Sequence, residues 1–282
     1  MKNLFFKSIK FDPLNNFLFY KIFGEKGNEV QLLGFINAVL GKTDDKKLVS
    51  VDIQENVNLM AEIISGKSCV LDVRAKLHNG DLVNIEVQLR NKYNFDRRSL
   101  YYQSKVYSTL LSSGDDYIKL PNIIAINIVN FDFPKTKSYH SCFRLREECE
   151  HDIILTDALE VHFINMVRFR RQLKGHKLLN DPLFRWLVWS NKDSPPEILK
   201  EVLRMDTAIQ AAEARLEQIT QSDLDYWTQT SRLLAECDRT SEINYAVGER
   251  NIEIARNLLA KGLTPELVSE TTGLSLKEIS KL

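Results

Sequence analysis

The sequence has no long hydrophobic run, and this absence excludes a membrane-spanning protein. Although 44% of the 282 residues are hydrophobic, no uninterrupted apolar stretch approaches the roughly 20 residues that a transmembrane helix needs. Near the start, charge returns at Lys7 too soon for a secretory signal. We therefore expect a folded cytoplasmic protein with one substantial core and a smaller appended region.

Paired cysteines and zinc-ligand spacings are also absent. No Cys-x-x-Cys pair occurs among the four cysteines, and the five histidines are scattered along the chain. This pattern does not indicate a zinc motif, and reduced, buried thiols are the expected state of the cysteines. The cysteines are Cys69, Cys142, Cys149 and Cys237, and the histidines are His78, His140, His151, His162 and His176.

An excess of positive charge is missing as well, because 38 basic residues balance 38 acidic ones. A net charge of zero does not indicate nucleic-acid binding, but the charge of one segment can differ from that of the whole chain. Residues 168–177 contain five Lys and Arg residues and no acid. This segment is either a phosphate-binding patch or a solvated basic loop, and its composition leaves both open.

Two acids and an amide stand on neighbouring predicted strands. Asp72 lies in the first strand, and Glu86 and Gln88 lie in the second, after a turn at Asn79-Gly80. Asn-Gly is a favoured hairpin turn, so the strands should be antiparallel partners. Alternation along a strand puts Glu86 and Gln88 on one face and leaves the apolar residues between them to pack on the other. Converging carboxylates favour a hard cation such as Mg²⁺.

Acids on the solvent face of a hairpin are also common, and spacing alone does not exclude that reading. The segment that follows, Asn94 to Ser113, has the pattern of a long helix whose apolar positions, Leu100 among them, are expected to face the sheet. Arg98, Tyr102 and Lys105 form one stripe on this helix. A basic, aromatic stripe beside an acidic metal pocket suits phosphodiester cleavage, since cations bind the phosphate and a metal activates water.

The elements predicted from the sequence divide the chain into a mixed α/β region, residues 1–180, and a helical region, residues 181–282. Ile123–Val129 is almost wholly apolar, which predicts a central strand covered on both faces, reached through the long helix. The predicted strands are Val49–Leu59, Lys67–Leu77, Asp81–Leu89, Ile123–Val129 and Leu159–Phe169. The predicted helices are Asn16–Phe23, Glu29–Leu40, Glu197–Gln218, Ser222–Cys237 and Ser241–Lys261.

The last twenty residues predict two short helices joined by a tight turn at Gly273. Thr264 and Ser275 are the expected N-caps, and the arrangement resembles a helix-turn-helix unit. The second helix offers only Lys277 and Lys281 to DNA, whereas a recognition helix usually displays more donors. A small docking or dimerising motif is the alternative interpretation of this tail.

Several motifs together resemble the recombination-promoting nuclease and transposase family, a branch of the PD-(D/E)xK nuclease superfamily. In order and spacing they cover most of the chain. The matching stretches are Asp12–Gly24, Leu71–Ala75, Asn84–Gln88, Arg98–Tyr102 and the tail from Asn257 to Ser275. The resemblance implies a restriction-endonuclease-like fold, in which a mixed sheet is flanked by helices.

The same resemblance implies roles for individual residues. Asp72 and Glu86 correspond to the ligands of Mg²⁺ or Mn²⁺, and Gln88 stands where many relatives have lysine. Glutamine cannot ionise, so it can only orient water or phosphate by hydrogen bonds. Asn16 stands where the family usually has aspartate, and Asp12 or Glu25 could replace that acid. The implied activity is hydrolysis of DNA in recombination or at mobile elements.

Arg98, Tyr102 and Lys105 are the predicted substrate-binding residues of this endonuclease. The alternatives are a catalytically silent relative that binds DNA or another protein, and an enzyme that acts on RNA, because this metal geometry does not distinguish the sugar. Cutting both DNA strands needs two sites, which is compatible with a homodimer.

Overall fold

The computed structural model describes residues 12–54, 73–89, 95–108, 110–111, 114, 116–173, 178–219, 223, 225 and 250–280. By their contacts, the residues form two compact units. One unit spans residues 1–57 and 70–220, and the other spans residues 58–69 and 221–282. The first unit contains a six-stranded sheet.

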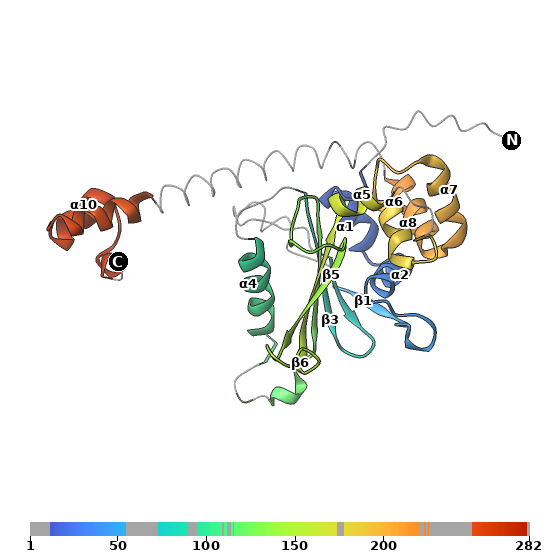
Figure 1. Cartoon of the computed structure of the whole chain (residues 1–282), viewed down its shortest axis with the longest axis horizontal. Helices are drawn as coiled ribbons and strands as arrows, with labels where there is room; N and C mark the ends of the chain where they lie inside the picture. The colour runs from blue at the N-terminus through green and yellow to red at the C-terminus, as the bar shows by residue number, and fades with distance from the viewer. Residues whose placement is uncertain are drawn as a thin grey trace. The chain divides into compact units, whose positions relative to one another are not determined.

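The sheet of the first unit is mixed, as predicted. Its strand order is β1-β2-β3-β4-β6-β5. The β3–β4 and β4–β6 pairs are parallel, and the other neighbours are antiparallel. The strands, which are seen side by side in Figure 1, are β1 (Val51–Ile53), β2 (Val73–Leu77), β3 (Leu82–Gln88), β4 (Ile123–Val129), β5 (His140–Arg146) and β6 (Ile154–Asn165).

The predicted hairpin joins β2 to β3. Gly80 has a φ angle of 93°, a left-handed conformation that glycine adopts without steric cost. The Asn79 side chain accepts a hydrogen bond from the backbone N–H of Asp81 at 3.2 Å, which fixes the turn. In the resulting register Val73 pairs with Ile85. The turn chemistry therefore confirms the antiparallel pairing of these two strands.

The crossover from β3 to β4 runs through helix α4 (Phe95–Ser108), also as predicted. All seven residues of β4 are buried, which confirms a central strand covered on both faces. The helical face turned inward differs from the predicted one, because Leu100 is 55% exposed while Phe95, Ser99 and Gln103 are each at most 4% exposed. The latter three recur every four residues, so polar side chains occupy most of the buried stripe.

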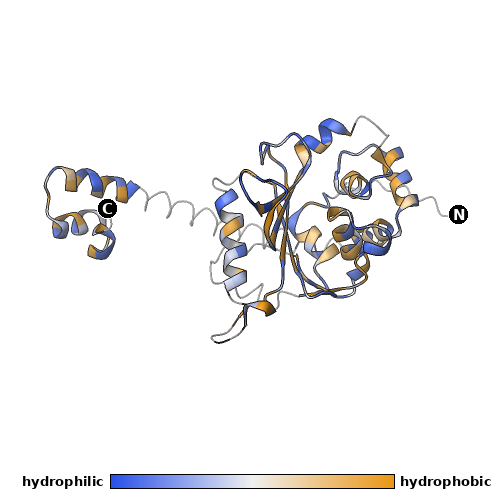
Figure 2. Ribbon diagram, turned by 60° about the horizontal axis from the view of Figure 1, so that its bottom comes forward, coloured by the Kyte–Doolittle hydropathy of each residue, from blue (hydrophilic) through white to orange (hydrophobic). Residues whose placement is uncertain are grey.

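The other helices of the first unit lie on the opposite side of the sheet from α4 (Figures 1 and 2). An aromatic cluster joins three of them: the Phe23 ring lies 4.6 Å from that of Phe19, 5.6 Å from Phe35 and 5.7 Å from Trp186. Burying each such side chain contributes about 1.5–3 kcal/mol. These helices are α1 (Asn16–Phe23), α2 (Glu29–Val39), α5 (Met166–Gln172), α6 (Pro182–Ser190), α7 (Pro196–Met205) and α8 (Thr207–Gln218).

Several predicted elements have different ends in the structure; for example, the helix predicted from Asn94 to Ser113 is observed as Phe95–Ser108. The last strand ends at Asn165 and not at Phe169, because the Asn165 side chain accepts from the N–H of Arg168 and caps α5. The helix predicted from Glu197 to Gln218 is interrupted at Asp206, which is extended and caps α8. The predicted helix Ser222–Cys237 lies outside the continuous described segments. The predicted strand Val49–Leu59 is observed as Val51–Ile53, and its residues 55–59 lie outside the described part.

Strand β5 was not predicted from the sequence. It is an edge strand whose last five residues are exposed, so it lacks the apolar alternation of a half-buried strand. For the same reason the expectation of buried thiols is wrong for Cys142 and Cys149, which are both exposed. Cys69 and Cys237 lie outside the described residues. Two short 3₁₀ segments, Asp44–Lys46 and Tyr117–Lys119, complete this unit.

The described part of the second unit is a helical cluster. Residues 250–260 are helical, followed by α10 (Pro265–Thr272) and α11 (Leu276–Ile279). Gly273 ends α10 in a left-handed conformation, and Ser275 with Glu278 forms a capping box at the start of α11. The predicted turn and N-caps are therefore confirmed. Across the described residues, no helix combines the length and apolar character needed to cross a membrane.

Candidate active site

Strand β3 carries the two predicted site residues that the structure describes. Val83, Ile85 and Val87 are buried on one face, so the alternating residues Asn84, Glu86 and Gln88 belong to the other. Glu86 is only 4% exposed, although the pattern suggested that the polar residues of this strand stay outside the packing. Gln88 is half-buried at the end of the strand.

The neighbour of Glu86 across the sheet is Asn127 on β4, its partner in the parallel register. Asn127 is 2% exposed and donates from Nδ2 to the backbone carbonyl of His162 at 3.1 Å. Ser99 on α4 donates from its hydroxyl to Asn127 Oδ1 at 3.4 Å. Because Ser99 reaches Asn127 from α4, Glu86 lies on the sheet face that α4 covers.

A second residue of α4 adds another polar group to this layer. Gln103 follows Ser99 by one helical turn and is 4% exposed. Within the described part of the chain, neither Gln103 Oε1 nor Asn84 Oδ1 has a hydrogen-bond partner, and both atoms are buried. A buried polar atom without a partner costs about 1–3 kcal/mol, so such atoms call for an explanation.

These side chains match the donors that a hard divalent cation prefers. Glu86 supplies a carboxylate, and Asn84, Gln88 and Gln103 supply amide oxygens. Mg²⁺ and Mn²⁺ take such oxygen ligands and usually keep several waters. Lone pairs on Gln103 Oε1 and Asn84 Oδ1 are available to water or a cation, so the residues present fit a site of this kind.

The side chains of the other predicted site residues lie outside the described part of the structure. Asp72 lies outside the described residues, directly before Val73, the first residue of β2. Arg98, Tyr102 and Lys105 belong to helix α4, as the stripe required, but their side chains lie outside the described part. Their roles stay predictions.

Three buried polar residues of this face were missed by the sequence reasoning: Ser99, Gln103 and Asn127. One signal could have found Asn127, because it is the only polar residue in the strand Ile123–Val129, and a polar residue within a fully buried strand needs a partner. The signal for Ser99 and Gln103 is weaker. It is the interval of four residues at which Phe95, Ser99 and Gln103 follow one another along the helix.

Asn16, which stands where the family usually has aspartate, begins helix α1 in the structure. Asn15 is the N-cap of α1 and accepts from the N–H groups of Phe17 and Leu18. The Oδ1 of Asn16 is buried and has no hydrogen-bond partner among the described residues. Glu25, considered as a replacement acid, is held by Arg215 at 2.7 Å and by Lys21.

The predicted basic segment is partly engaged within the protein. Arg168 donates to Asp132 Oδ1 at 2.6 and 3.1 Å and to the Thr136 hydroxyl at 2.9 Å. Arg170 donates to the side chain of Asn130. Residues 174–177 lie outside the described part. The side chains of Arg168 and Arg170 therefore connect α5 by hydrogen bonds to the segment after β4. These contacts favour a structural role for the two arginines.

Comparison with known families gives two matches that follow one another along the chain. Residues 13–246 match the model of the PD-(D/E)XK nuclease family transposase, which covers well over half of the 282 residues.

The chain belongs to this family. The membership agrees with the mixed sheet flanked by helices, and the fold is restriction-endonuclease-like. Residues 249–282 match the C-terminal helix-turn-helix domain of the Rpn/YhgA-like nuclease family, in agreement with the helix-turn-helix resemblance of the tail. No curated protein and no solved structure matches the chain.

Proposed function

We propose that this PD-(D/E)XK family member is a Mg²⁺-dependent DNA endonuclease that acts in recombination or transposition. The observation that carries the proposal is the burial of the Glu86 carboxylate, 4% exposed, in a polar layer between β3, β4 and α4. A charged group is rarely buried without a cation or hydrogen-bond donors to balance it. Membership in a family of nuclease-type transposases is consistent with a buried carboxylate that binds a metal ion.

Asp72 and Glu86 would hold the cation, which can be Mg²⁺ or Mn²⁺. Such a cation supplies Lewis acidity that makes water a stronger nucleophile and offsets the charge on the phosphate. Gln88 would orient the attacking water through its side-chain amide, because it cannot accept or release a proton at neutral pH. Gln103 and Asn84 would accept hydrogen bonds from water in the same layer.

The substrate would be bound by Arg98, Tyr102 and Lys105, which share helix α4 with Ser99 and Gln103. Two cations on one helix can pair with phosphates on the DNA backbone, and they provide affinity that falls with salt. The helix-turn-helix domain at residues 249–282 would add contacts to DNA. A homodimer would place two cleavage sites on one duplex.

The test is nicking of supercoiled plasmid by the purified chain in Mg²⁺ or Mn²⁺. Asp72→Ala and Glu86→Gln should each lower the nicking rate by at least about 100-fold, because either change removes a cation ligand. The matched control is Asp52→Asn, which neutralises an exposed acid of the same sheet and should nick like the wild type. Far-ultraviolet circular dichroism and melting curves of all four proteins report whether they fold alike.

The outcomes separate the alternatives. If the wild type binds plasmid without nicking it, the chain is a silent relative that serves binding. If it cuts single-stranded or duplex RNA faster than DNA, the metal chemistry stands and the assigned substrate is wrong. If Glu86→Gln nicks as fast as Asp52→Asn, Glu86 is not a ligand and the proposed site is wrong.

A further inference from the structure

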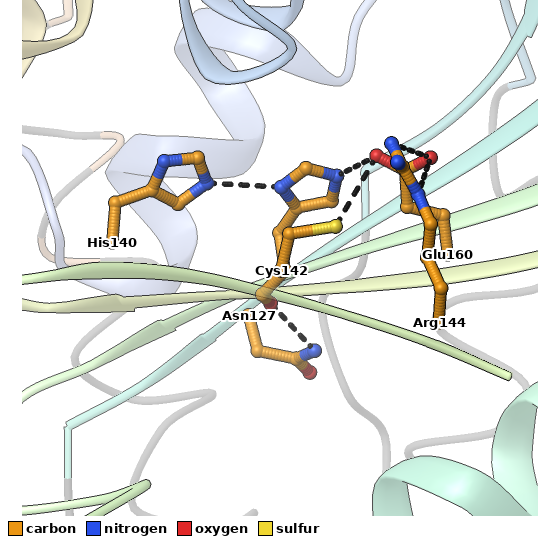
Figure 3. Close-up of polar contacts among 6 residues, drawn as sticks. Asn127, His140, Cys142, Arg144 and Glu160 are labelled. Atoms are coloured by element: carbon orange, nitrogen blue, oxygen red, sulfur yellow. Dashed lines mark hydrogen bonds and ion pairs between the residues drawn. The ribbon is translucent and has the colours of Figure 1, made fainter. Parts of the chain in front are cut away.

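A second cluster of polar side chains lies on β5 and β6. His140, Cys142 and Arg144 alternate along β5, so they share one face of that strand. Glu160 and His162 alternate in the same way along β6. Across the antiparallel pair, Cys142 is the register partner of His162 and Arg144 is the partner of Glu160. The five side chains therefore meet on one face of the sheet (Figure 3).

This cluster is separate from the layer around Glu86, because the two lie on opposite faces of the sheet. Glu86 pairs with Asn127, whereas His162 pairs with Ile126, the residue before it. Neighbouring residues of a strand point to opposite faces. Figure 3 shows the Asn127 side chain on the other side of the strands from Cys142 and Glu160.

Three potential ligand atoms converge in the cluster. One ligand atom from each of Cys142, Glu160 and His162 lies within 4.8 Å of the other two. The Sγ to Oε1 distance is 3.4 Å, and the Nε2 to Oε1 distance is 2.7 Å. Ligands at about 2.0–2.3 Å from a tetrahedral zinc ion are themselves a little over 3 Å apart. The three side chains are therefore close enough to share one ion after a small rearrangement.

Two further residues hold these ligand side chains in place. Arg144 donates from Nε and Nη2 to Glu160 Oε2 at 2.9 and 2.7 Å, which leaves Oε1 facing the other two ligands. His140 Nε2 lies 2.9 Å from His162 Nδ1, and the two rings stack at an angle of 13°. A histidine that binds a metal usually donates its other ring N–H to a hydrogen-bond acceptor, and the neutral ring nitrogen of His140 can act as one.

We propose that Cys142, Glu160 and His162 form a Zn²⁺ site, with His140 and Arg144 as positioning residues. Sulfur, nitrogen and carboxylate donors in one set select Zn²⁺ over Mg²⁺, which prefers oxygen alone. The residues border a cavity of about 500 Å³ that Tyr139 and Asp181 also line. Three protein ligands leave the fourth position of the ion open to water or a small ligand in this cavity.

An unassisted cysteine nucleophile is a less suitable interpretation of the same side chains. Although Cys142 is exposed as a residue, partial desolvation of its thiol, together with the nearby Glu160 carboxylate, raises the pKa of the thiol to about 11. A reactive cysteine requires the thiolate at neutral pH, and its surroundings usually lower the pKa.

The test uses the full-length chain, stripped of metal with a chelator and titrated with Zn²⁺ and, as an optical probe, Co²⁺. We expect one tightly bound equivalent and a thiolate-to-cobalt charge-transfer band. Cys142→Ser should abolish the band and weaken Zn²⁺ binding by at least about 100-fold, and His140→Ala should weaken it by about 10–100-fold. Zn²⁺ should raise the melting temperature of the wild type but not of Cys142→Ser.

Two controls use residues outside the cluster. Cys149→Ser removes the other exposed thiol and should keep the charge-transfer band, and Glu86→Gln should keep it because Glu86 lies on the opposite face. Because Cys142 is exposed, its substitution should leave the circular dichroism spectrum unchanged. The absence of a thiolate band in the wild type, or an equal band in Cys142→Ser, would overturn the zinc site.

Discussion

Tyr139 contacts two helices, α6 through a hydrogen bond of its hydroxyl and α5 through packing of its ring. Its hydroxyl donates to Asp181 Oδ2 at 3.0 Å, and Asp181 Oδ1 in turn caps α6 by accepting from the N–H of Leu183. The ring packs edge-on against Phe169 at 5.9 Å. Burial, followed by the adjacent Asp181 charge, raises the pKa of Tyr139 well above its ordinary value. The folded protein therefore retains this phenolic proton at high pH.

Tyr139→Phe should change the stability of the protein in a pH-dependent way. At pH 7 the variant loses the hydrogen bond to Asp181 and should be less stable by about 1–2 kcal/mol. The raised pKa means that the contribution of Tyr139 is complete below the unfolded pKa of about 10 and is lost as the pH rises above it. Urea unfolding of both proteins between pH 7 and 10.5 measures this. A stability difference that does not narrow at high pH would contradict the expectation.

Residues whose position follows from a pattern within one short segment could be predicted from the sequence. Residues whose partners come from distant segments could not. The position of Glu86 and Gln88 on one face of β3 could be predicted because alternation within one strand is visible in the sequence. Asn127 was missed because its partners, Ser99 and the carbonyl of His162, come from distant segments. The zinc ligands were missed for the same reason, since Cys142 lies 18 residues from Glu160. Contacts of this range depend on strand order, which no local pattern specifies.

Among the helices, α2 and α8 pack unusually closely at Gly34. A Cβ atom at this position would lie 2.4 Å from the Cβ of Ala208 on α8 and 3.3 Å from the Trp186 ring. Glycine in a helix interior costs up to about 1 kcal/mol relative to alanine. Its presence here is explained by the close approach of the two helices.

Gly34→Ala should destabilise the protein by about 1–2 kcal/mol. The free-energy cost of shifting the helices to avoid the steric overlap is larger than the gain in helix propensity. Ala208→Gly in the same chain removes the opposing Cβ and should restore most of the loss. Ala214→Gly on the exposed side of α8 serves as the control for the propensity cost alone. Chemical denaturation of the four proteins provides the measurement. An additive double variant would show that the two positions are not in contact.

The predictability of elements followed their apolar periodicity and caps. Helix α1 was predicted with its observed ends, since Asn15 caps it and an apolar pattern follows. Strand β4 was likewise predicted from Ile123 to Val129. Strand β5 was missed because its polar, exposed residues are held by pairing with β6 rather than by burial. The break at Asp206 was missed because aspartate both tolerates helices and caps them.

At the scale of the whole molecule, the chain contains two compact units with separate cores. The second has its own apolar cluster, formed by Ala255, Val268 and Ile279. Gly273 in this unit has a φ angle of 72°, where a Cβ atom is strained. The boundary expected at residue 180 stays a prediction, and α8, which lies beyond that boundary, contacts α1 and α2.

Heating should therefore unfold the protein in two calorimetric transitions. Gly273→Ala adds about 1 kcal/mol of backbone strain and should lower the transition of the C-terminal unit by several degrees. Gly34→Ala should lower only the other transition. Differential scanning calorimetry of both variants tests this assignment. A single transition that both substitutions shift equally would mean that the two units unfold together.

The contact of α8 with α1 and α2 also sets an order of events during synthesis. Arg215 binds Glu25 across 190 residues of sequence, and it also donates to the carbonyl of Lys21. The first helices to leave the ribosome must therefore wait for α8 before their packing is complete. Because a chain is extended at only about 5–20 residues per second, this delay lasts on the order of ten seconds or more. The packing of the N-terminal helices is therefore completed only after about three-quarters of the 282 residues have been translated.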